Sequence, residues 1–425
     1  MTTSQPAAPT RDITPSRALT MSTVAFTVCF AVWTIFSIIG VRIKDELGLS
    51  ETAFGLLVGT PILTGSLVRL ALGIWTDRYG GRLVYTLTML AAAVATLLLS
   101  FAHTYPQMLA AALGLGVAGG SFAVGVAYVA RFYPAEKQGT ALGIFGVGNV
   151  GAAVTKFIAP FVLVAWGWEA VAQIWALVLV VMAVVFWFTT GDDPVIRAQR
   201  AGRAARPKLA SEFAPLKSLQ VWRFALYYFF VFGGFVALAL WLPRYLIGVY
   251  GFDIATAGLI GAAYSVPASI FRAYGGVLSD KAGARSVMYW TFAVSAACTA
   301  LLSIPAADYV VQGIDGPKAF HFEIGPWAFT AIVFVLGFFM SLGKAAVYKH
   351  IPVYYPQNVG AVGGLVGMIG GLGGFFLPLL FGVLNDLTGL WTSCFMALFV
   401  IVAASLAWMH FAVRRMERDE RLQPA

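Results

Sequence analysis

The chain has 425 residues, of which 60% are hydrophobic and 11% are charged, and its mean hydropathy is +0.82. This composition leaves too little polar surface for a soluble protein of this length, so we expect the chain to fold in lipid. The formal net charge of +9 gives no support for a nucleic-acid role, because it reflects basic residues gathered in short segments between apolar runs.

The apolar runs are long enough for membrane-spanning helices, which need roughly 20 residues each. The strands of a barrel would instead alternate apolar and polar residues over roughly 10 residues. We therefore predict an all-α polytopic membrane protein with twelve transmembrane helices. The predicted spans are 22–41, 54–75, 84–102, 107–130, 140–165, 170–190, 221–247, 255–278, 286–304, 326–347, 360–384 and 392–412.

The polar segments divide these spans into two halves. Residues 1–21 lack the apolar core of a signal peptide and are expected to remain as an N-terminal tail. The longest later polar stretch, 191–218, links a six-helix bundle at 22–190 to a second one at 219–412, and 413–425 form a C-terminal tail. Lysine and arginine are concentrated on the side of this linker, which predicts a multi-pass protein of the cytoplasmic (inner) membrane with both termini in the cytoplasm.

Two smaller features limit the possible functions. Cys29, Cys298 and Cys394 lie within predicted spans, so we interpret them as packing residues rather than as disulfides or metal ligands. On the opposite side from the linker, Arg42 and Lys44 are expected to be balanced by Asp45 and Glu46. The sequence shows no nucleophile with a positioned base, metal cluster or nucleotide loop, so we expect a monomeric non-enzyme without a cofactor.

The two halves repeat one motif. Four residues of the first half recur 203 positions later: Arg69, Gly73, Asp77 and Arg82 correspond to Arg272, Gly276, Asp280 and Arg285. A second repeat pairs RFYP, ending at Pro134, with VYYP, ending at Pro356, and a glycine-rich run follows each. Two repeated six-helix halves with a cavity between them are typical of a secondary transporter that rocks one half against the other.

These motifs carry a family resemblance. GIWTDRYGGR at 73–82 resembles the cytoplasmic helix 2–3 motif of the major facilitator superfamily, and GVLSDKAGAR at 276–285 resembles its repeat. GVGNVGAAVTKFIAP at 146–160 and GGLVGMIGGLGGFFLP at 363–378, with one arginine each in helices 2 and 8, resemble the paired signature of the nitrate/nitrite porter family. The resemblance spans all twelve helices and implies transport of nitrate and nitrite. It also implies a gating role for the loop motif residues Asp77, Arg78, Arg82, Asp280 and Arg285.

Arg69 and Arg272 are permanent cations within predicted spans. Each lies eight residues before the aspartate that ends its span, about 12 Å from the helix end and too deep to reach the interface easily. A pseudo-two-fold relation would place the two guanidinium groups face to face, and no aspartate or glutamate lies inside a predicted span to balance them. We therefore expect an anionic substrate between them, and a guanidinium suits a planar oxyanion such as nitrate. The alternative is a structural pair bonded to backbone carbonyls or water.

The family resemblance implies further substrate-binding residues. It assigns the Asn149 amide to a nitrate oxygen, and it assigns Phe122 and Tyr228 to the flat walls that enclose a flat anion. Without the resemblance, an asparagine in a glycine-rich helix is as readily a packing residue. The two aromatic residues would be ordinary core residues of membrane helices.

The coupling of transport is the least determined feature. Moving an anion into a negative interior costs about 2.3 kcal/mol per 100 mV, which favours nitrate/proton symport. Lys156 is deep and without an acidic neighbour in sequence, and it is the first candidate proton carrier, with His350 a second. We interpret the cluster of Lys344, Lys349 and His350 chiefly as side chains that reach the cytoplasmic interface.

Several other functions stay open at this point. A nitrate/nitrite antiporter is the main alternative, because the family that the chain resembles includes both modes. An organic-anion or organophosphate antiporter of the same superfamily is a further one, although a bulky dianion would need more polar side chains than these helices supply. A transporter-like sensor would carry a signalling domain, for which the 28-residue linker leaves no room.

Overall fold

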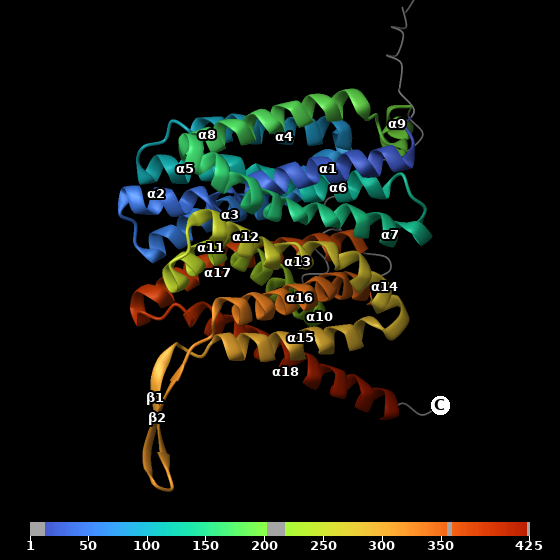
Figure 1. The fold of residues 1–425 in the computed structure, drawn as a ribbon. Coiled ribbons are helices and arrows are strands. Elements are labelled where there is room, and N and C mark those ends of the chain that lie inside the picture. The colour runs from blue at the N-terminus through green and yellow to red at the C-terminus, as the bar shows by residue number, and fades with distance from the viewer. Residues whose placement is uncertain (1–12, 202–216, 355–358, 423–425) are drawn as a thin grey trace, which may run out of the picture.

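The computed structural model describes residues 13–201, 217–354 and 359–422, and these fold almost entirely as helices arranged in two layers (Figure 1). We call α1 to α8 the N-terminal half and α10 to α18 the C-terminal half. The N-terminal half contains α1 (Pro15–Trp33), η1 (Ile35–Ser37), α2 (Ile39–Leu47), α3 (Glu51–Tyr79), α4 (Gly81–Leu99), α5 (Tyr105–Leu115), η2 (Gly116–Gly120), α6 (Ser121–Ala130), α7 (Ala135–Gly146), η3 (Val147–Val150) and α8 (Gly151–Thr189). The short helix α9 (Pro194–Arg200) follows it.

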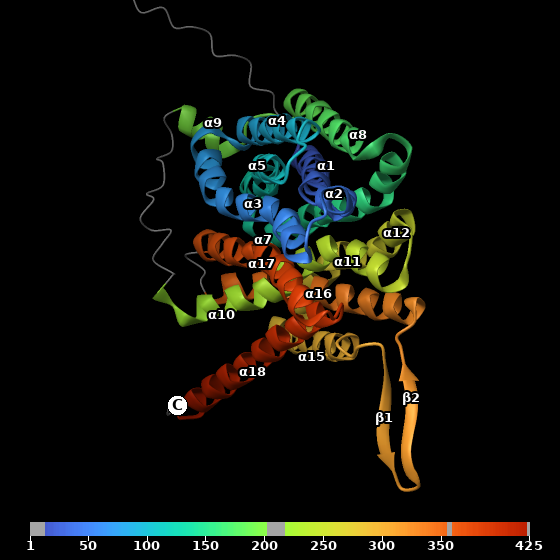
Figure 2. The same ribbon diagram turned by 90° about the vertical axis from the view of Figure 1, so that its left-hand side faces the viewer.

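The C-terminal half lies against the N-terminal half, and a view from one end of the helices shows the two halves as separate layers (Figure 2). It contains α10 (Leu219–Tyr228), η5 (Phe229–Gly234), α11 (Phe235–Tyr250), α12 (Ile254–Ser265), α13 (Pro267–Ile270), α14 (Arg272–Ala282), α15 (Ala284–Leu302), α16 (Pro326–Tyr354), α17 (Val359–Thr388) and α18 (Ser393–Leu422). The predicted all-α membrane fold is confirmed, and every predicted span falls mainly on helical residues.

The span count is less regular than the sequence suggests. Within the described residues, nine helical segments are long and apolar enough to cross a membrane, and the bent pair Ile254–Ile270 and Arg272–Ala282 makes ten. One of the nine, Ala141–Thr189, covers two predicted spans, which meet at Gly167, where φ is +85°. Glycine adopts this backbone conformation readily, so it marks the turn between the two spans.

One element was not predicted. Strands β1 (Ala307–Gly313) and β2 (Gly316–Phe322) form an antiparallel hairpin in which Ala307 pairs with Phe322 and Gly313 with Gly316. From the sequence we assign no element to the residues between spans 286–304 and 326–347. The hairpin projects from one end of the bundle (Figure 1). We call this end the hairpin end, and the opposite end, where α9 lies, the linker end.

The 203-residue repeat is visible in the helices themselves. Gly80, with a φ of +93°, directly follows α3, and Gly283, with a φ of +82°, directly follows α14. The helices that follow, α4 and α15, each have 19 residues. Positive φ at both turns requires glycine in practice, which explains why glycine recurs at the same place in each half.

Helices α3 and α17 form a close contact between the halves. A Cβ atom at Gly55 would lie 2.3 Å from the carbonyl oxygen of Pro378, and one at Gly371 would lie 2.5 Å from Ser66 Oγ. A Cβ atom at Gly374 would lie 2.8 Å from the side chain of Ile62. Glycines on both helices therefore bring the two backbones together, as small residues do at helix contacts in membranes.

Candidate functional site: a pair of buried arginines between the halves

Arg69 lies on α3 and its guanidinium group is buried between the halves, at 6% exposure. Its Nη1 donates to the carbonyl oxygen of Gly367 on α17 at 2.9 Å, and its Nε donates to Gly119 at 3.4 Å. Its Cζ atom lies 5.4 to 5.5 Å from the ring centroids of Trp33, Phe122 and Phe232. Three aromatic faces thus surround a cation that is held by backbone carbonyls.

Arg272 is the first residue of α14 and is equally buried, at 6% exposure. Its Cζ atom lies 5.7 Å from the ring of Phe122 and 5.7 Å from that of Tyr348. Its Nη1 atom has no hydrogen-bond partner among the described residues. A buried donor without a partner is costly, so this guanidinium is chemically ready to bind an acceptor.

Phe122 and Tyr228 connect the surroundings of the two arginines. Phe122 lies on α6, and both guanidinium groups face its ring. Tyr228, at the end of α10, stacks on Phe232 with a centroid distance of 5.0 Å and meets Tyr348 edge-on at 5.0 Å. The structure thus brings Arg69, Arg272, Phe122 and Tyr228 into one cluster.

Asn149 lies in η3, the short 3-10 segment between α7 and α8, and is completely buried. Neither its Oδ1 nor its Nδ2 atom has a hydrogen-bond partner within the described residues. Amide groups without partners are rare in protein interiors. η3 packs against α13, which lies just before Arg272 in the chain. The amide therefore lies in the same region of the interface between the two halves, which we call the seam.

The structure separates the two proposed proton carriers. Lys156 on α8 is fully buried, and its Nζ donates to the carbonyl of Ala152, 3.1 Å away on the same helix. Its stem packs on α12, where a Cβ atom at Gly261 would lie 3.1 Å from its Cδ. His350 lies at the linker end, hydrogen-bonded through Nδ1 to the carbonyl of Ala346. No contact in the described part of the chain joins either residue to an arginine of the pair.

One interpretation from the sequence is wrong. We expected Lys344 to reach the cytoplasmic interface, but it is fully buried. Helix α16 continues to Tyr354, beyond the predicted span end at 347, so Lys344 lies deeper in the helix than expected. Lys349 fits the expectation better, since it is half-exposed and forms an ion pair with Asp280.

The loop motif residues lie at the linker end. Arg82 donates through Nε and Nη2 to the carbonyl of Trp187, at 3.0 and 2.7 Å, and so holds the end of α8. Arg285 approaches Glu417 at 3.8 Å, and Asp280 pairs with Lys349. The side chains of Asp77 and Arg78 lie outside the described part of the structure. The described motif residues therefore connect helices within one half.

A contact between the halves at the hairpin end was missed by the sequence analysis. Glu51 Oε1, on the first residue of α3, accepts from Arg244 Nη2 at 2.6 Å and lies 3.3 Å from Lys44 Nζ. Asp386 on α17 accepts from the backbone nitrogens of Glu51 and Thr52, at 3.2 and 2.8 Å, and from the Thr52 hydroxyl. Lys44 therefore pairs with Glu51 rather than Asp45, whereas Arg42 pairs with Glu46 as expected, at 2.9 Å.

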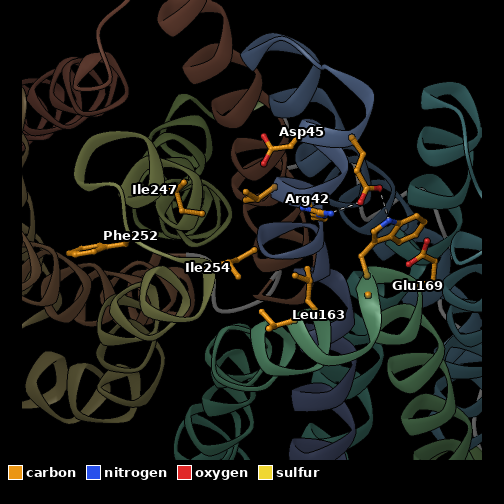
Figure 3. Close-up of a pocket in the computed structure, with 12 residues that line it drawn as sticks. Arg42, Asp45, Leu163, Glu169, Ile247, Phe252 and Ile254 are labelled. Carbon is orange, nitrogen blue, oxygen red and sulfur yellow. Dashed lines mark hydrogen bonds and ion pairs between the residues drawn. The ribbon is translucent and has the colours of Figure 1, made fainter.

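A cavity of about 570 Å³ opens at the hairpin end of the seam rather than at the arginines (Figure 3). Its lining combines Arg42, Asp45 and Glu169 with the apolar side chains of Leu163 and Ile254. Arg42 and Trp168 both bind the Glu46 carboxylate beside it. The arginine pair is closed off by its aromatic neighbours, so we take the pair, and not this cavity, as the candidate site.

Other neighbours of the two arginines were not predicted from the sequence. Phe232 follows Tyr228 by four residues, and this spacing on one helical face could have indicated it. Nothing in the sequence singles out Trp33 or Tyr348. The acceptor at Gly367 is a backbone carbonyl, so the pattern of side chains in the sequence could not have predicted its bond with Arg69.

Comparisons with known proteins agree with this architecture. The family model of the Major Facilitator Superfamily matches residues 21–314 and 250–424. The fold aligns with a TM-score of 0.73 to the crystal structure of a bacterial homologue of the human lysosomal transporter Spinster, in an inward-facing and unoccupied conformation. The alignment covers 97% of this chain and 99% of that one, at 17% sequence identity. The fold and the buried site between two halves therefore define a membrane transporter of the major facilitator superfamily.

Sequence relatives narrow the family. The chain is 45% identical to the probable nitrate/nitrite antiporter NarK1 of Thermus thermophilus, across 95% of this chain and 93% of that protein. It is 29% identical to the nitrite extrusion protein of Bacillus subtilis (strain 168), across 95% and 96%. It is also 29% identical to the probable nitrate transporter NarT of Staphylococcus haemolyticus, across 87% and 90%. The chain belongs to the nitrate/nitrite porter family of this superfamily.

Proposed function

We propose that the protein carries nitrate, and nitrite as well, across the cytoplasmic membrane by alternating access. The observation that carries this proposal is the pair of buried arginines, one from each half, that share the ring of Phe122. Among the described residues neither guanidinium forms an ion pair with a carboxylate. A small anion would supply the missing negative charge and would draw the two halves together.

The shape of the site supports a planar anion. The flat guanidinium groups present donors in one plane, and the ring of Phe122 limits the space beside them. In this proposal the amide of Asn149 donates to an anion oxygen. Tyr228, which packs on Phe232 and Tyr348, forms one side of the anion site. A bulky organic anion has no comparable room among these rings. One chain supplies every residue of the site, so we propose that it works as a monomer.

The orientation in the membrane follows from charge. We propose that the linker end and both termini face the cytoplasm, because the linker and the C-terminal tail are rich in lysine and arginine. The hairpin end would then face outward. The contacts of Glu51 with Arg244 and of Asp386 with Thr52 join the halves at that end, and alternating access requires them to break.

Coupling to protons is the mode that we favour, with Lys156 and His350 as the candidate carriers from the sequence. The 45% identity to a protein named as a probable nitrate/nitrite antiporter favours exchange as the alternative mode. In exchange, an outgoing nitrite would balance the incoming charge, and no residue of the chain would need to change its protonation state.

Transport into proteoliposomes tests the function and separates the modes. We expect nitrate uptake by the unmodified protein, inhibited by nitrite and insensitive to organic phosphates, and strongly reduced uptake by the Arg69→Lys variant at the same nitrate concentration. Uptake driven by an acidic exterior without internal anion supports symport, whereas uptake only with internal nitrite supports exchange. Equal uptake by the unmodified and Arg69→Lys proteins would contradict the proposed site, and preferred uptake of an organic phosphate would contradict the proposed substrate.

A further inference from the structure

Lys344 is a buried cation that the proposed function leaves unused. It lies in α16 with no exposed surface, and its Nζ donates to the carbonyl oxygen of Ala268 on α13. The same Nζ atom lies 3.7 Å from the ring centroid of Phe235. A lysine ammonium has three donors, and among the described residues one carbonyl oxygen and one aromatic ring contact it.

The internal repeat relates Lys344 to a residue of the arginine cluster. Lys344 stands twelve residues before Pro356, as Phe122 stands twelve residues before Pro134, and the two prolines end the matched RFYP and VYYP motifs. Lys344 is therefore the counterpart, in the C-terminal half, of the ring that both guanidinium groups face. Its acceptor, Ala268, precedes Arg272 by four residues, about one helical turn.

The charged and titratable groups around Lys344 are few. Arg272 of α14 interacts with it electrostatically, and Tyr264 of α12 donates to the carbonyl of Phe235, the residue whose ring faces the ammonium. Tyr228 of α10 contacts Tyr348, which follows Lys344 by four residues on α16. Within the described residues no carboxylate is bonded to Lys344. Its charge is therefore opposed by Arg272 and balanced by no side chain.

These observations deepen the proposed function and rest on it. We propose that Lys344 is the titratable group of the anion site, protonated while an anion lies between Arg69 and Arg272 and neutral when the anion has left. Arginine keeps its charge under all physiological conditions, so of these three cations only the lysine can exchange a proton. On release, one Nζ–H bond breaks, the electron pair remains on Nζ, and the proton passes to water on the side to which the site is open.

The consequence is a linkage between anion and proton. If the anion stabilises the protonated amine, then protonation strengthens anion binding by the same factor, because such coupling is reciprocal. Nitrate binding then takes up one proton. As the pH rises the Kd for nitrate rises with it, by up to about tenfold per pH unit between the pKa values of the empty and occupied states.

The test measures nitrate binding to the purified full-length protein from about pH 5 to about pH 9, by calorimetry in buffers of different ionisation enthalpy. We expect proton uptake and a pH-dependent Kd in the unmodified protein and in Lys318→Met, an exposed control on β2. Lys344→Arg keeps the charge without a titratable amine, so it should bind nitrate with a Kd that does not change with pH and without proton uptake. Lys344→Met should also bind without proton uptake.

Each outcome separates the two proposals. Absence of nitrate binding by the unmodified protein contradicts the proposed function and this inference with it. Nitrate binding without proton uptake leaves the function intact and overturns the role of Lys344. Proton uptake that persists in Lys344→Arg and disappears in Lys156→Gln would assign the proton to Lys156 instead. If Lys344→Met fails to fold, the Lys344→Arg variant decides alone, since it keeps the charge and most of the side-chain volume.

Discussion

Arg69 of the N-terminal half donates a hydrogen bond to the carbonyl oxygen of Gly367 in the C-terminal half, at 2.9 Å. Arg272 of the C-terminal half has the reciprocal position, because a Cβ atom at Gly146 of α7 would lie 3.2 Å from its Cδ atom. Each arginine thus lies against a glycine-rich segment of the opposite half. This relationship explains the paired signature in the sequence, since the glycines leave the space that the long side chains cross.

The arginine pair gives the first prediction. Arg69→Lys and Arg272→Lys should each weaken nitrate binding by roughly 10- to 150-fold, the loss of one hydrogen bond to a charged group, about 1.5–3 kcal/mol. Lysine keeps the charge and loses the planar set of donors. The Kd for nitrate measures the effect, and the melting temperature reports whether the protein remains folded. Near-normal affinity in either folded variant would exclude planar recognition.

The glycine-rich segment gives a second prediction with a matched control. Gly146→Ala should weaken nitrate binding by roughly tenfold, about 1.4 kcal/mol, because the added methyl group would lie 3.3 Å from the Cζ atom of Arg272 and displace it. Gly143→Ala lies three residues earlier, where no atom outside its own helix and chain neighbours lies within 4 Å of the added carbon. Equal Kd values for the two variants would show that the position of Arg272 does not depend on this contact.

Asn149→Ala should weaken nitrate binding by about 1.5–3 kcal/mol without lowering the stability of the empty protein. Its amide has no partner in the described part of the chain, so its removal costs no internal hydrogen bond. Comparing the nitrate Kd with the melting temperature measured without nitrate separates binding from packing. A large fall in that melting temperature would make Asn149 a structural residue.

Glu51→Gln should weaken the closure of the hairpin end. The substitution removes the negative charge that binds Arg244 across the seam, and breaking a partly buried charge pair favours separation of its partners. Spin labels at His103 and Leu387, one on each half, should report longer distances in a larger fraction of molecules. Arg42→Gln is the control, since it breaks the pair with Glu46 inside the N-terminal half. Distances that are unchanged in Glu51→Gln would show that this pair does not hold the halves together.

The hairpin offers a prediction of pH dependence. The hydrogen bond between His321 Nδ1 and Asp308, 2.8 Å long, raises the pKa of the exposed histidine above its usual value. The ion pair requires the protonated histidine and is therefore lost as the pH rises through this raised pKa. Titration of His321 by NMR should show the shift, and Asp308→Asn should reduce it. A normal pKa in the unmodified protein would mean that the two side chains do not pair in solution.

The sequence predicted the parts of the fold that depend on composition and repetition. The apolar runs predicted the helices. The 203-residue offset between Arg69 and Arg272 predicted that one arginine of each half is buried. The β-hairpin could also have been found, because the segment GIDG at 313–316, in which Ile314 and Asp315 connect the two strands, combines glycine and aspartate as turns do. Its strands are short and carry polar residues, so they stand out little beside the long apolar runs of the chain.

Contacts between distant residues, and the depth of a residue near a helix end, have no local signal in the sequence. Glu51 and Arg244 are 193 residues apart, and only the packing of α3 beside α11 brings them together. The burial of Lys344 depends on how far α16 extends, and helix ends are the least predictable part of a helix. Lys344 therefore had the sequence pattern of an interfacial lysine although the fold places it inside.

In the proposed site, the bond from Arg69 to Gly367 makes anion binding partly an exchange of acceptors. The backbone carbonyl already accepts from Nη1 of the guanidinium, so an anion that takes this donor must replace an internal acceptor. This competition lowers the net affinity and shortens the lifetime of the bound state. Release on the far side is assisted in the same way, because the carbonyl can return as the anion leaves.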